Sequence, residues 1–222
     1  MDYYYTNKNS TSISKGSVKL KICGMNHNTE EVAVLKPDYL GFIFWEPSTR
    51  HFKDPMPAIP HSIKKVGVFV NETIEIVLEN IKKYGLLAVQ LHGKESPKYC
   101  EMLKEKVKHI EIIKVFSLKD SFNFGILSAY EAVADFFLFD TKGKLPGGNG
   151  YTFDWKLLEN YPSTKPYFLS GGIGLEELPL LQEFLQKSAS KYCYAIDVNS
   201  KFETAPGLKD IKKLKEFINS IK

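Results

Sequence analysis

The chain has 222 residues, of which 43% are hydrophobic and 25% charged, a composition that excludes a mostly disordered chain, a collagen-like repeat and a coiled coil. Thirty Lys and Arg stand against 26 Asp and Glu, and a net charge of +4 is too small and too evenly spread to indicate a nucleic-acid partner. No apolar run approaches the ~20 residues that a membrane helix needs, so we expect no membrane partner either.

Residues 1–17 are polar and rich in Tyr, Ser and Asn, and they lack the apolar centre of a secretory signal. We interpret them as a disordered tail. The cysteines (Cys23, Cys100 and Cys193) are few and unclustered, which argues against a disulfide scaffold and against zinc. We therefore expect a cytoplasmic, reducing setting, with organelle targeting through the tail as the open alternative.

From Val18 onward, a β-branched or aromatic run, a polar turn and an amphipathic stretch recur along the chain. This pattern predicts strands at 18–23, 39–44, 65–70, 88–92, 110–116, 136–141, 167–172 and 194–200. It predicts helices at 72–85, 96–107, 121–133, 174–188 and 210–222. Between the second and third strands, Pro47, Pro55, Pro57 and Pro60 favour a long loop with at most a short helix.

Nearly all-apolar strands that alternate with helices indicate a parallel sheet covered on both faces. Both an open doubly wound sheet and a closed barrel satisfy this pattern. Because the units number eight, at roughly 25 residues each, and no composition break divides them, we predict a single-domain (β/α)₈ TIM barrel over 18–222.

In such a barrel, the active site lies at the carboxyl ends of the strands. The residues there are Cys23-Gly24, Gln90 to Gly93, Asp140-Thr141, Ser170 to Gly172 and Asp197 to Ser200, with Arg50 in the loop after the second strand. Core packing does not require such a gathering of polar groups and glycines, so it predicts a site.

Cys23 shares its strand face with Lys19 and Lys21, which predicts that it points into the barrel mouth. A lysine two residues below favours the thiolate that a general base needs, although a small buried hydrophobe is an equally ordinary role for a free cysteine. We interpret Cys100 and Cys193 as packing residues.

Asp140 ends an apolar strand, on one face with Phe136 and Leu138. A carboxyl group held over apolar neighbours suits a general acid working near neutrality, whereas a turn cap is the simpler alternative. We interpret the glycine-rich segment 142–150 that follows as either a mobile lid over the site or merely a connector.

The SGGIG segment (170–174) leads into a predicted helix, and DVNS (197–200) ends the last strand. Backbone N–H groups at such a position bind phosphate, although a turn that needs positive φ explains the glycines equally well. Arg50, the only arginine, offers the planar pair of donors that suits a carboxylate or phosphate. His92 is either a ligand-facing residue or part of the framework, and the other histidines form no metal set.

Seven segments together resemble the phosphoribosylanthranilate isomerase family: KICGM (21–25), GFIFWEPSTR (41–50), VGVFVNE (66–72), VQLHG (89–93), 139–155, LSGGIG (169–174) and AIDVNSKFE (195–203) with PGLKD (206–210). The resemblance runs from about Val18 to the C-terminus. It implies a (β/α)₈ barrel of tryptophan biosynthesis, a monomer or homodimer, that performs an Amadori rearrangement on a phosphorylated small molecule without cofactor or metal.

By this resemblance Cys23 is the general base, Asp140 the general acid, and Arg50 the residue that holds the anthranilate carboxylate. His92 and Asp197 contact the substrate, Asp197 by ordering the mouth or lying near the ribose. The phosphate-binding residues implied are Gly171, Gly172, Asn199 and Ser200. The family usually continues S-S-G in the last loop, whereas this chain has Lys201 in place of the glycine, which could supply charge there.

Two other readings stay open at this point. Another phosphate-binding barrel is one, such as a sugar-phosphate epimerase, which would need several metal-binding His and Asp residues, or an indole-forming synthase, which would need a lysine and glutamates. An inactive barrel that serves as a binding partner is the other, although the presence of both Cys23 and Asp140 argues against it.

Overall fold

The structure is a computed structural model that describes residues 18–141 and 154–221. The predicted tail (1–17) and the whole candidate lid (142–150) lie outside the described residues. None of the described helices is long and apolar enough to cross a membrane.

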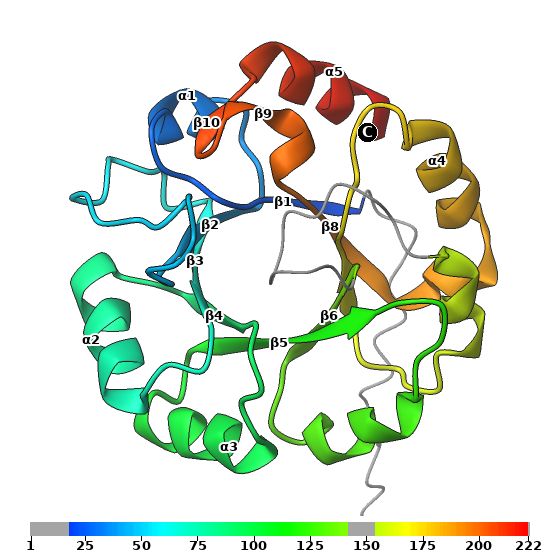
Figure 1. Ribbon diagram of the computed structural model, residues 1–222, viewed down its shortest axis with the longest axis horizontal. Helices are drawn as coiled ribbons and strands as arrows, with labels where there is room; N and C mark the ends of the chain where they lie inside the picture. The colour runs from blue at the N-terminus through cyan, green and yellow to red at the C-terminus, as the bar shows by residue number, and fades with distance from the viewer. Residues whose placement is uncertain (1–17, 142–153, 222) are drawn as a thin grey trace, which may run out of the picture.

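Eight parallel strands close into a barrel in the order β1 to β8, with β8 pairing back onto β1 (Figure 1). The strands are β1 (Lys19–Ile22), β2 (Tyr39–Ile43), β3 (Lys64–Phe69), β4 (Ala88–Leu91), β5 (Glu111–Leu118), β6 (Phe136–Thr141), β7 (Tyr167–Leu169) and β8 (Cys193–Val198). The prediction of a closed barrel rather than an open sheet is confirmed, and all eight predicted strands are present within a few residues of their expected bounds.

The helices form the outer ring in Figure 1. They are α1 (Thr29–Ala33), α2 (Ile74–Tyr84), α3 (Pro97–Lys106), α4 (Leu178–Gln186) and α5 (Ile211–Ile221), together with the short 3₁₀ helices η1 (Phe124–Tyr130), η2 (Trp155–Asn160), η3 (Ser188–Tyr192) and η4 (Ser200–Phe202). A small antiparallel hairpin, β9 (Glu203–Ala205) with β10 (Leu208–Lys209), follows η4. Residues 44–63 between β2 and β3 form a long loop, as the prolines predict.

Two predicted helices differ from the observed ones. The segment expected to be α-helical over 121–133 is the 3₁₀ helix η1, where Gly125 and Ser128 are weak helix formers and the Ser128 hydroxyl donates to the Gly125 carbonyl. Helix α4 starts at Leu178 rather than near Gly174, because Pro179 lacks an N–H and is tolerated only in the first turn. The glycine-rich turn therefore does not run directly into the helix.

Alternation along the strands sorts the barrel interior into two levels. The lower level is apolar, with Tyr39, Val66, Ala88, Ile113, Val115, Leu138, Phe168 and Ala195 in one buried cluster. Two residues further along four of these strands, on the same face, stand Gln90, Asp140, Ser170 and Asp197. A second and larger apolar cluster lies between the strands and the surrounding helices. The apolar level closes the barrel from below, so the polar side chains face the mouth.

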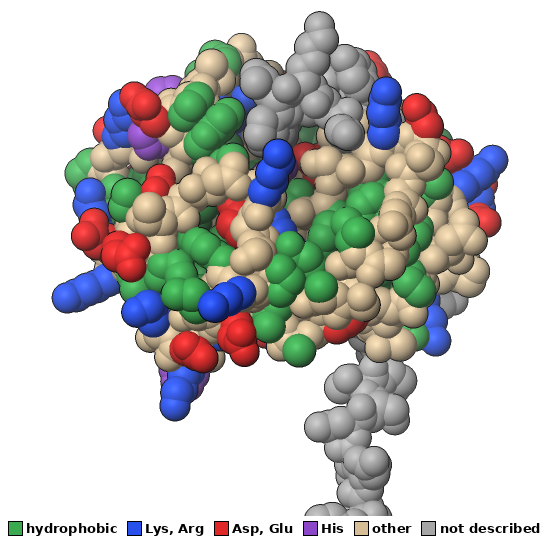
Figure 2. All heavy atoms as spheres, turned by 60° about the horizontal axis from the view of Figure 1, so that its bottom comes forward, with side chains coloured by type: hydrophobic (Ala, Val, Ile, Leu, Met, Phe, Trp, Pro, Cys, Tyr) green, Lys and Arg blue, Asp and Glu red, His purple; other side chains and the backbone are tan. Residues whose placement is uncertain are grey.

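The outer surface carries charges of both signs. On the face in Figure 2, lysine side chains alternate with acidic ones and with small apolar areas, without a continuous basic patch among the described residues. Several surface charges of the described residues are paired, such as Lys19 with Asp38 at 2.8 Å and Lys187 with Glu183 at 2.6 Å. Charges of both signs on this face fit the modest net charge.

Candidate active site

A cavity opens at the carboxyl ends of the strands and holds about 710 Å³ of space, part of it open to solvent. All nine site residues predicted from the sequence line it: Cys23, Arg50, His92, Asp140, Gly171, Gly172, Asp197, Asn199 and Ser200. Ile43, Trp45, Ser48, Val68, Val70, Gln90, Ser170, Ile173 and Lys201 complete its wall. The fold thus brings together side chains that are up to 178 positions apart in the sequence.

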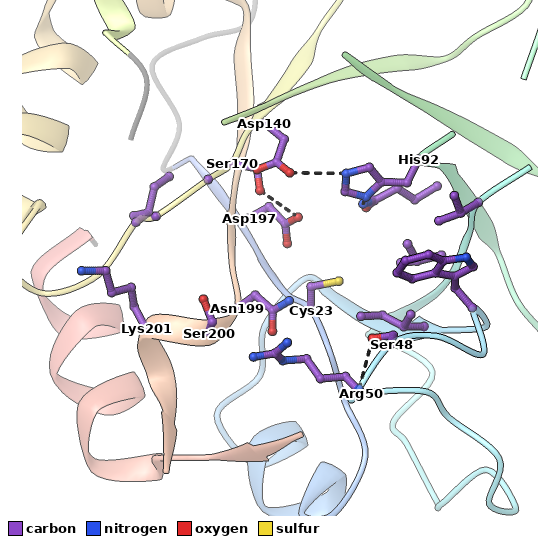
Figure 3. A pocket seen from close by; sticks show the side chains of 18 residues that line it. Cys23, Ser48, Arg50, His92, Asp140, Ser170, Asp197, Asn199, Ser200 and Lys201 are labelled. Atoms are coloured by element: carbon purple, nitrogen blue, oxygen red, sulfur yellow. Dashed lines mark hydrogen bonds and ion pairs between the residues drawn. The ribbon is translucent and has the colours of Figure 1, made fainter. Parts of the chain in front are cut away.

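Cys23 directly follows β1, and in Figure 3 it lies between Asp140 and Arg50. Its backbone N–H donates to the Val198 carbonyl at 2.9 Å, which extends the pairing of β1 with β8 and fixes the thiol at the mouth. Burial raises the pKa of the Cys23 thiol, and the nearby Lys21 ammonium offsets this only in part. Lys21 thus favours the thiolate, as expected, although not enough to lower the pKa of the Cys23 thiol overall. Burial raises this pKa by more than Lys21 lowers it, and the negative charge of Asp197 raises it further.

Lys21 and Asp197 form an ion pair of 2.9 Å beneath Cys23, with both side chains almost completely buried. The register places Lys21 directly opposite Asp197 on β8. Ser170 Oγ donates to the second carboxylate oxygen at 3.4 Å. Asp197 is thus held by two residues of the barrel wall, and its lining position is consistent with a role in ordering the mouth.

Asp140 stands on β6, separated from Cys23 in the barrel order by β7 and β8. The Thr141 backbone N–H donates to Asp140 Oδ1 at 3.0 Å, and His92 Nε2 lies 3.3 Å from Asp140 Oδ2 without an aligned hydrogen bond. The other ring nitrogen of His92, Nδ1, lies 3.3 Å from Gln90 Nε2. Because an amide NH₂ only donates, this contact makes Nδ1 the acceptor and leaves the proton of a neutral ring on Nε2, which has no aligned acceptor among the described residues.

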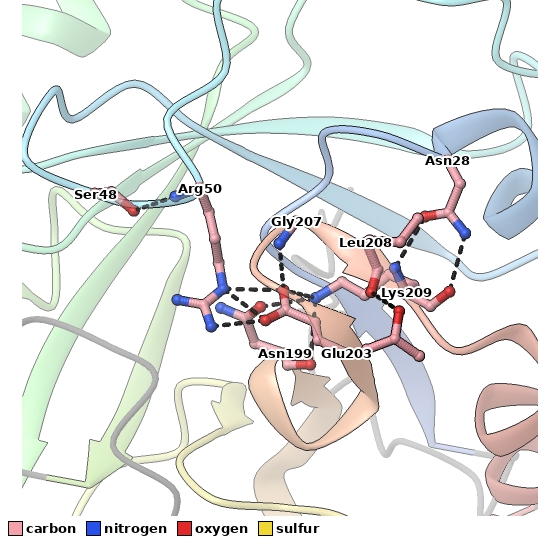
Figure 4. A network of polar contacts seen from close by, with 9 residues as sticks. Asn28, Ser48, Arg50, Asn199, Glu203, Gly207, Leu208 and Lys209 are labelled. Carbon is pink, nitrogen blue, oxygen red and sulfur yellow. Dashed lines mark hydrogen bonds and ion pairs between the residues drawn. The ribbon is translucent and has the colours of Figure 1, made fainter.

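Arg50 lies at the edge of the cavity but is already engaged with a carboxylate of the chain itself. Its Nε and Nη2 donate to Glu203 on β9 over distances of 2.6–2.9 Å, in a bidentate pair (Figure 4). Within the described part of the chain, Nη1 has no acceptor. One edge of the guanidinium is therefore taken, and the Nη1 edge is open to a second anion.

The turn after β7 needs glycine because it passes close to Asp140 and Thr141. Gly171 has φ +91°, and a Cβ on it would lie 2.5 Å from the Thr141 backbone nitrogen and 2.8 Å from Asp140 Oδ1. Gly172 also has a positive φ, of +70°. Close approach and backbone conformation explain both glycines without a ligand, so their part in phosphate binding stays a prediction.

Asn199 and Ser200 lead from β8 into η4, and Lys201 follows at the cavity wall. The Lys201 ammonium lies 3.5 Å from Glu176 and 3.9 Å from Glu177, which precede α4. Its charge is shared with two carboxylates, so the charge that the sequence suggested for the phosphate end is partly neutralised within the chain.

Sequence reasoning missed several contributors to this site. Gln90 was named only as a strand-end residue, although it sets the orientation of His92. Glu203 and Lys209, which hold Arg50 and Asn199, were quoted in motifs without a role. The signal that could have found them is the acidic and basic residues of 201–210 in the last strand-to-helix connection, which returns to the mouth. No group of three or more His, Cys, Asp or Glu side chains within 18–141 and 154–221 is placed to hold a metal ion.

A closed parallel barrel with ionisable side chains gathered at the carboxyl ends of its strands defines a (β/α)₈-barrel enzyme. The family model described as N-(5'phosphoribosyl)anthranilate (PRA) isomerase matches residues 20–220. The chain belongs to this family. The predicted family, and with it an isomerase of tryptophan biosynthesis, is confirmed.

Individual relatives agree with the family match. An N-(5'-phosphoribosyl)anthranilate isomerase of Parabacteroides distasonis is 42% identical over 91% of this chain and 92% of its own length. The crystal structure of the phosphoribosyl anthranilate isomerase from Thermus thermophilus superposes with a TM-score of 0.77 at 26% identity, covering 91% of this chain and 98% of that one. A phosphoribosyl anthranilate isomerase in complex with reduced 1-(o-carboxyphenylamino)-1-deoxyribulose 5-phosphate superposes with a TM-score of 0.74 at 28% identity, covering 92% and 98%.

Proposed function

We propose that the chain isomerises N-(5-phosphoribosyl)anthranilate to 1-(2-carboxyphenylamino)-1-deoxyribulose 5-phosphate, with Asp140 as general acid and Cys23 as general base. One observation carries the assignment of roles. A carboxyl group and a thiol from strands separated by two others line one cavity, which also holds the arginine and the loops after β7 and β8. Acid and base that approach one substrate from different strands are what this rearrangement requires.

In the first step, Asp140 donates its proton to the ribose ring oxygen. The bond between that oxygen and C1′ breaks as the lone pair of the anthranilate nitrogen forms a Schiff base. His92 Nε2 lies 3.3 Å from Asp140 Oδ2, so an N–H at this nitrogen would stabilise the negative charge left on Asp140 after the proton has gone.

In the second step, the Cys23 thiolate removes the proton from C2′, and the electrons of the broken C–H bond form the enolamine, which tautomerises to the ketone. Because burial raises the pKa of the Cys23 thiol, the thiolate is the minor form near neutrality. A base of raised pKa is a stronger proton acceptor once it is ionised. The faster proton transfer from C2′ therefore partly offsets the free-energy cost of forming the thiolate.

The two ends of the substrate are anionic. The open Nη1 edge of Arg50 fits the anthranilate carboxylate, since a guanidinium binds a carboxylate through parallel hydrogen bonds. Gly171, Gly172, Asn199 and Ser200 surround the other end and would receive the phosphate, with Asp197 near the ribose. A monomer or homodimer stays a prediction.

The test is the isomerase assay itself. Purified protein without added metal should remove the anthranilate-type fluorescence of phosphoribosylanthranilate. Cys193→Ser is a matched control for Cys23→Ser, since Cys193 is a free cysteine that does not line the cavity. Absence of turnover in a folded wild-type protein would refute the proposal.

A further inference from the structure

The arginine at the cavity edge is part of a larger network of buried charges at the end of β8 (Figure 4). Glu203, whose side chain is only 5% exposed, accepts from Arg50 on one side and from Lys209 Nζ at 2.8 Å on the other. The Gly207 backbone N–H donates to the same carboxylate at 3.2 Å. Two cations and one carboxylate leave a net charge of +1, which suits an anionic ligand.

Glu203 makes this arrangement possible. Without its negative charge, the Arg50 guanidinium and the Lys209 ammonium would repel each other in a poorly hydrated place. Burial raises the pKa of Glu203, but Arg50 and Lys209 outweigh burial and hold that pKa below its ordinary value. The carboxylate is therefore ionised at neutral pH, and its two oxygens fix the plane of the guanidinium.

Lys209 extends the network from Glu203 to Asn199. Its side chain is completely buried, and its Nζ donates to Asn199 Oδ1 at 2.8 Å and to the Asn199 carbonyl at 3.2 Å, besides Glu203. An ammonium group has three N–H donors, so all of them are used. Asn28 holds the Lys209 backbone through two hydrogen bonds of 2.9 Å.

Asn199 is the residue at which β8 ends and the loop with Ser200 and Lys201 begins. Its side chain also packs against Gly24, where a Cβ would lie 2.5 Å from Asn199 Oδ1 and 2.9 Å from Arg50 Cδ. Gly24 has φ +72°, so both its backbone and its surroundings require glycine. The Arg50 side chain and the Asn199 loop are thereby held in one rigid assembly.

We propose that Glu203 and Lys209 are positioning residues: Glu203 orients Arg50 toward the substrate carboxylate, and Lys209 fixes that arginine relative to the loop that receives the phosphate. The inference rests on the proposed function for the identity of the two anionic groups. In this arrangement, the side chains of Glu203 and Lys209 fix the distance between the carboxylate subsite and the phosphate subsite. Selectivity for a ligand that carries a carboxylate at one end and a phosphate at the other follows from this spacing.

The test separates the two ends by using one probe for each. Binding of anthranilate is followed by its fluorescence and binding of inorganic phosphate by calorimetry, alongside the KM and kcat for phosphoribosylanthranilate. Glu203→Gln should weaken anthranilate binding and raise KM about 10-fold, the scale of one lost charge-assisted hydrogen bond, with kcat changed less and phosphate binding retained. Lys209→Gln should weaken phosphate binding as well.

Asp135→Asn is the matched control. Asp135 also accepts from a lysine, Lys104 at 2.5 Å, and from a backbone N–H, that of Ile112 at 2.7 Å, but it precedes β6 at the other end of the barrel. This variant should leave both probes unaffected. In an Arg50→Met background, Glu203→Gln should have no further effect on anthranilate binding, because Glu203 acts through the arginine.

Unchanged anthranilate binding in Glu203→Gln, or an equal loss in the Arg50→Met background, would overturn the role of Glu203. Unchanged phosphate binding in Lys209→Gln would overturn the link to Asn199. Should either variant fail to fold, Glu203→Asp and Lys209→Met, which keep most of the side-chain volume, carry the same tests. A wild-type protein that binds both probes and has no isomerase activity would refute the proposed function and leave the positioning role standing.

Discussion

The two ends of the barrel interior are built from the same strands and differ in almost every physical respect. At the amino end, Tyr39, Phe136, Phe168 and Tyr194 pack ring against ring, with centroids 5.4 Å apart for both Tyr39–Phe168 and Phe136–Phe168. The two tyrosine hydroxyls there satisfy each other at 3.1 Å. At the carboxyl end, two residues beyond Leu138, Phe168 and Ala195, stand Asp140, Ser170 and Asp197.

The difference shows that the amino end stabilises the fold, whereas the carboxyl end gives up some stability to place charged groups in the active site. Burying aromatic surface is favourable, whereas burying ion pairs such as Lys21–Asp197 and Arg50–Glu203 costs desolvation that the pairing only partly returns. The carboxyl end accepts this cost because charges placed in a cavity can act on a substrate. Substitutions at the two ends should therefore separate into effects on turnover and effects on folding.

The largest effect is expected from removing the acid or the base. Cys23→Ser and Asp140→Asn should each reduce kcat by about 10³-fold or more, because general acid–base groups contribute on this scale and each step needs its own group. Circular dichroism and the free energy of unfolding should stay close to those of the wild type. Substantial turnover in either variant would remove the assigned mechanism, while Cys193→Ser should keep full activity.

The amino end gives the opposite result. Phe168 is completely buried in the apolar level, and Phe168→Ala should lower the free energy of unfolding by about 3–5 kcal/mol, since it leaves a cavity. Denaturant titration measures this loss. The kcat of the molecules that remain folded should be unchanged, and a fall in kcat at unchanged stability would mean that the two ends are not separable.

Arg50→Lys should have an intermediate effect on catalysis. A lysine keeps the charge but cannot serve Glu203 and a substrate carboxylate with one planar group. We expect kcat/KM to fall roughly 10- to 100-fold, about 1.4–2.8 kcal/mol, in steady-state assays. An unchanged kcat/KM would show that the arginine only pairs with Glu203.

Much of the fold and of the candidate site could be predicted from the sequence, because strands, alternation and motifs are patterns of neighbouring residues. Runs such as YLGFIF fix strands, and period-two alternation correctly placed Cys23 and Asp140 at the mouth once a barrel was assumed. The order of the eight units then brought the other predicted residues to the same cavity. Motif spacing added the family, which the family model and the relatives confirm.

What escaped prediction depends on contacts between distant segments. Glu203 and Lys209 lie in a charged stretch that reads as a solvated connection, and they are buried only because the β9–β10 hairpin folds back toward Arg50. Helix type at 121–133 was misjudged because periodicity does not distinguish a 3₁₀ turn from an α-helix. The net shift in the pKa of the Cys23 thiol escaped prediction because neither the burial that raises it nor the carboxylate of Asp197, 176 residues from Lys21, is visible in the local sequence.

This last point leads to the smallest expected effect, which concerns pH. Burial raises the pKa of the Cys23 thiol above its ordinary value, so the thiolate forms as the pH rises through that raised pKa and is lost as the pH falls below it. The rate at which Cys23 is alkylated should therefore continue to increase beyond the usual thiol range near ~8.5 instead of levelling off there. Each pH unit below the raised pKa should lower that rate by about 10-fold, because only the thiolate reacts.

A pH series of the alkylation rate of Cys23 checks this. Cys193→Ser serves as the background, so that alkylation of the partly exposed Cys193 does not contribute. A plateau of the rate already near neutral pH would show that Lys21 prevails over burial and that the base is preformed as a thiolate. A rise that continues at alkaline pH would instead show that the free protein holds its base as the neutral thiol, because burial at the carboxyl end of the barrel outweighs the charge of Lys21.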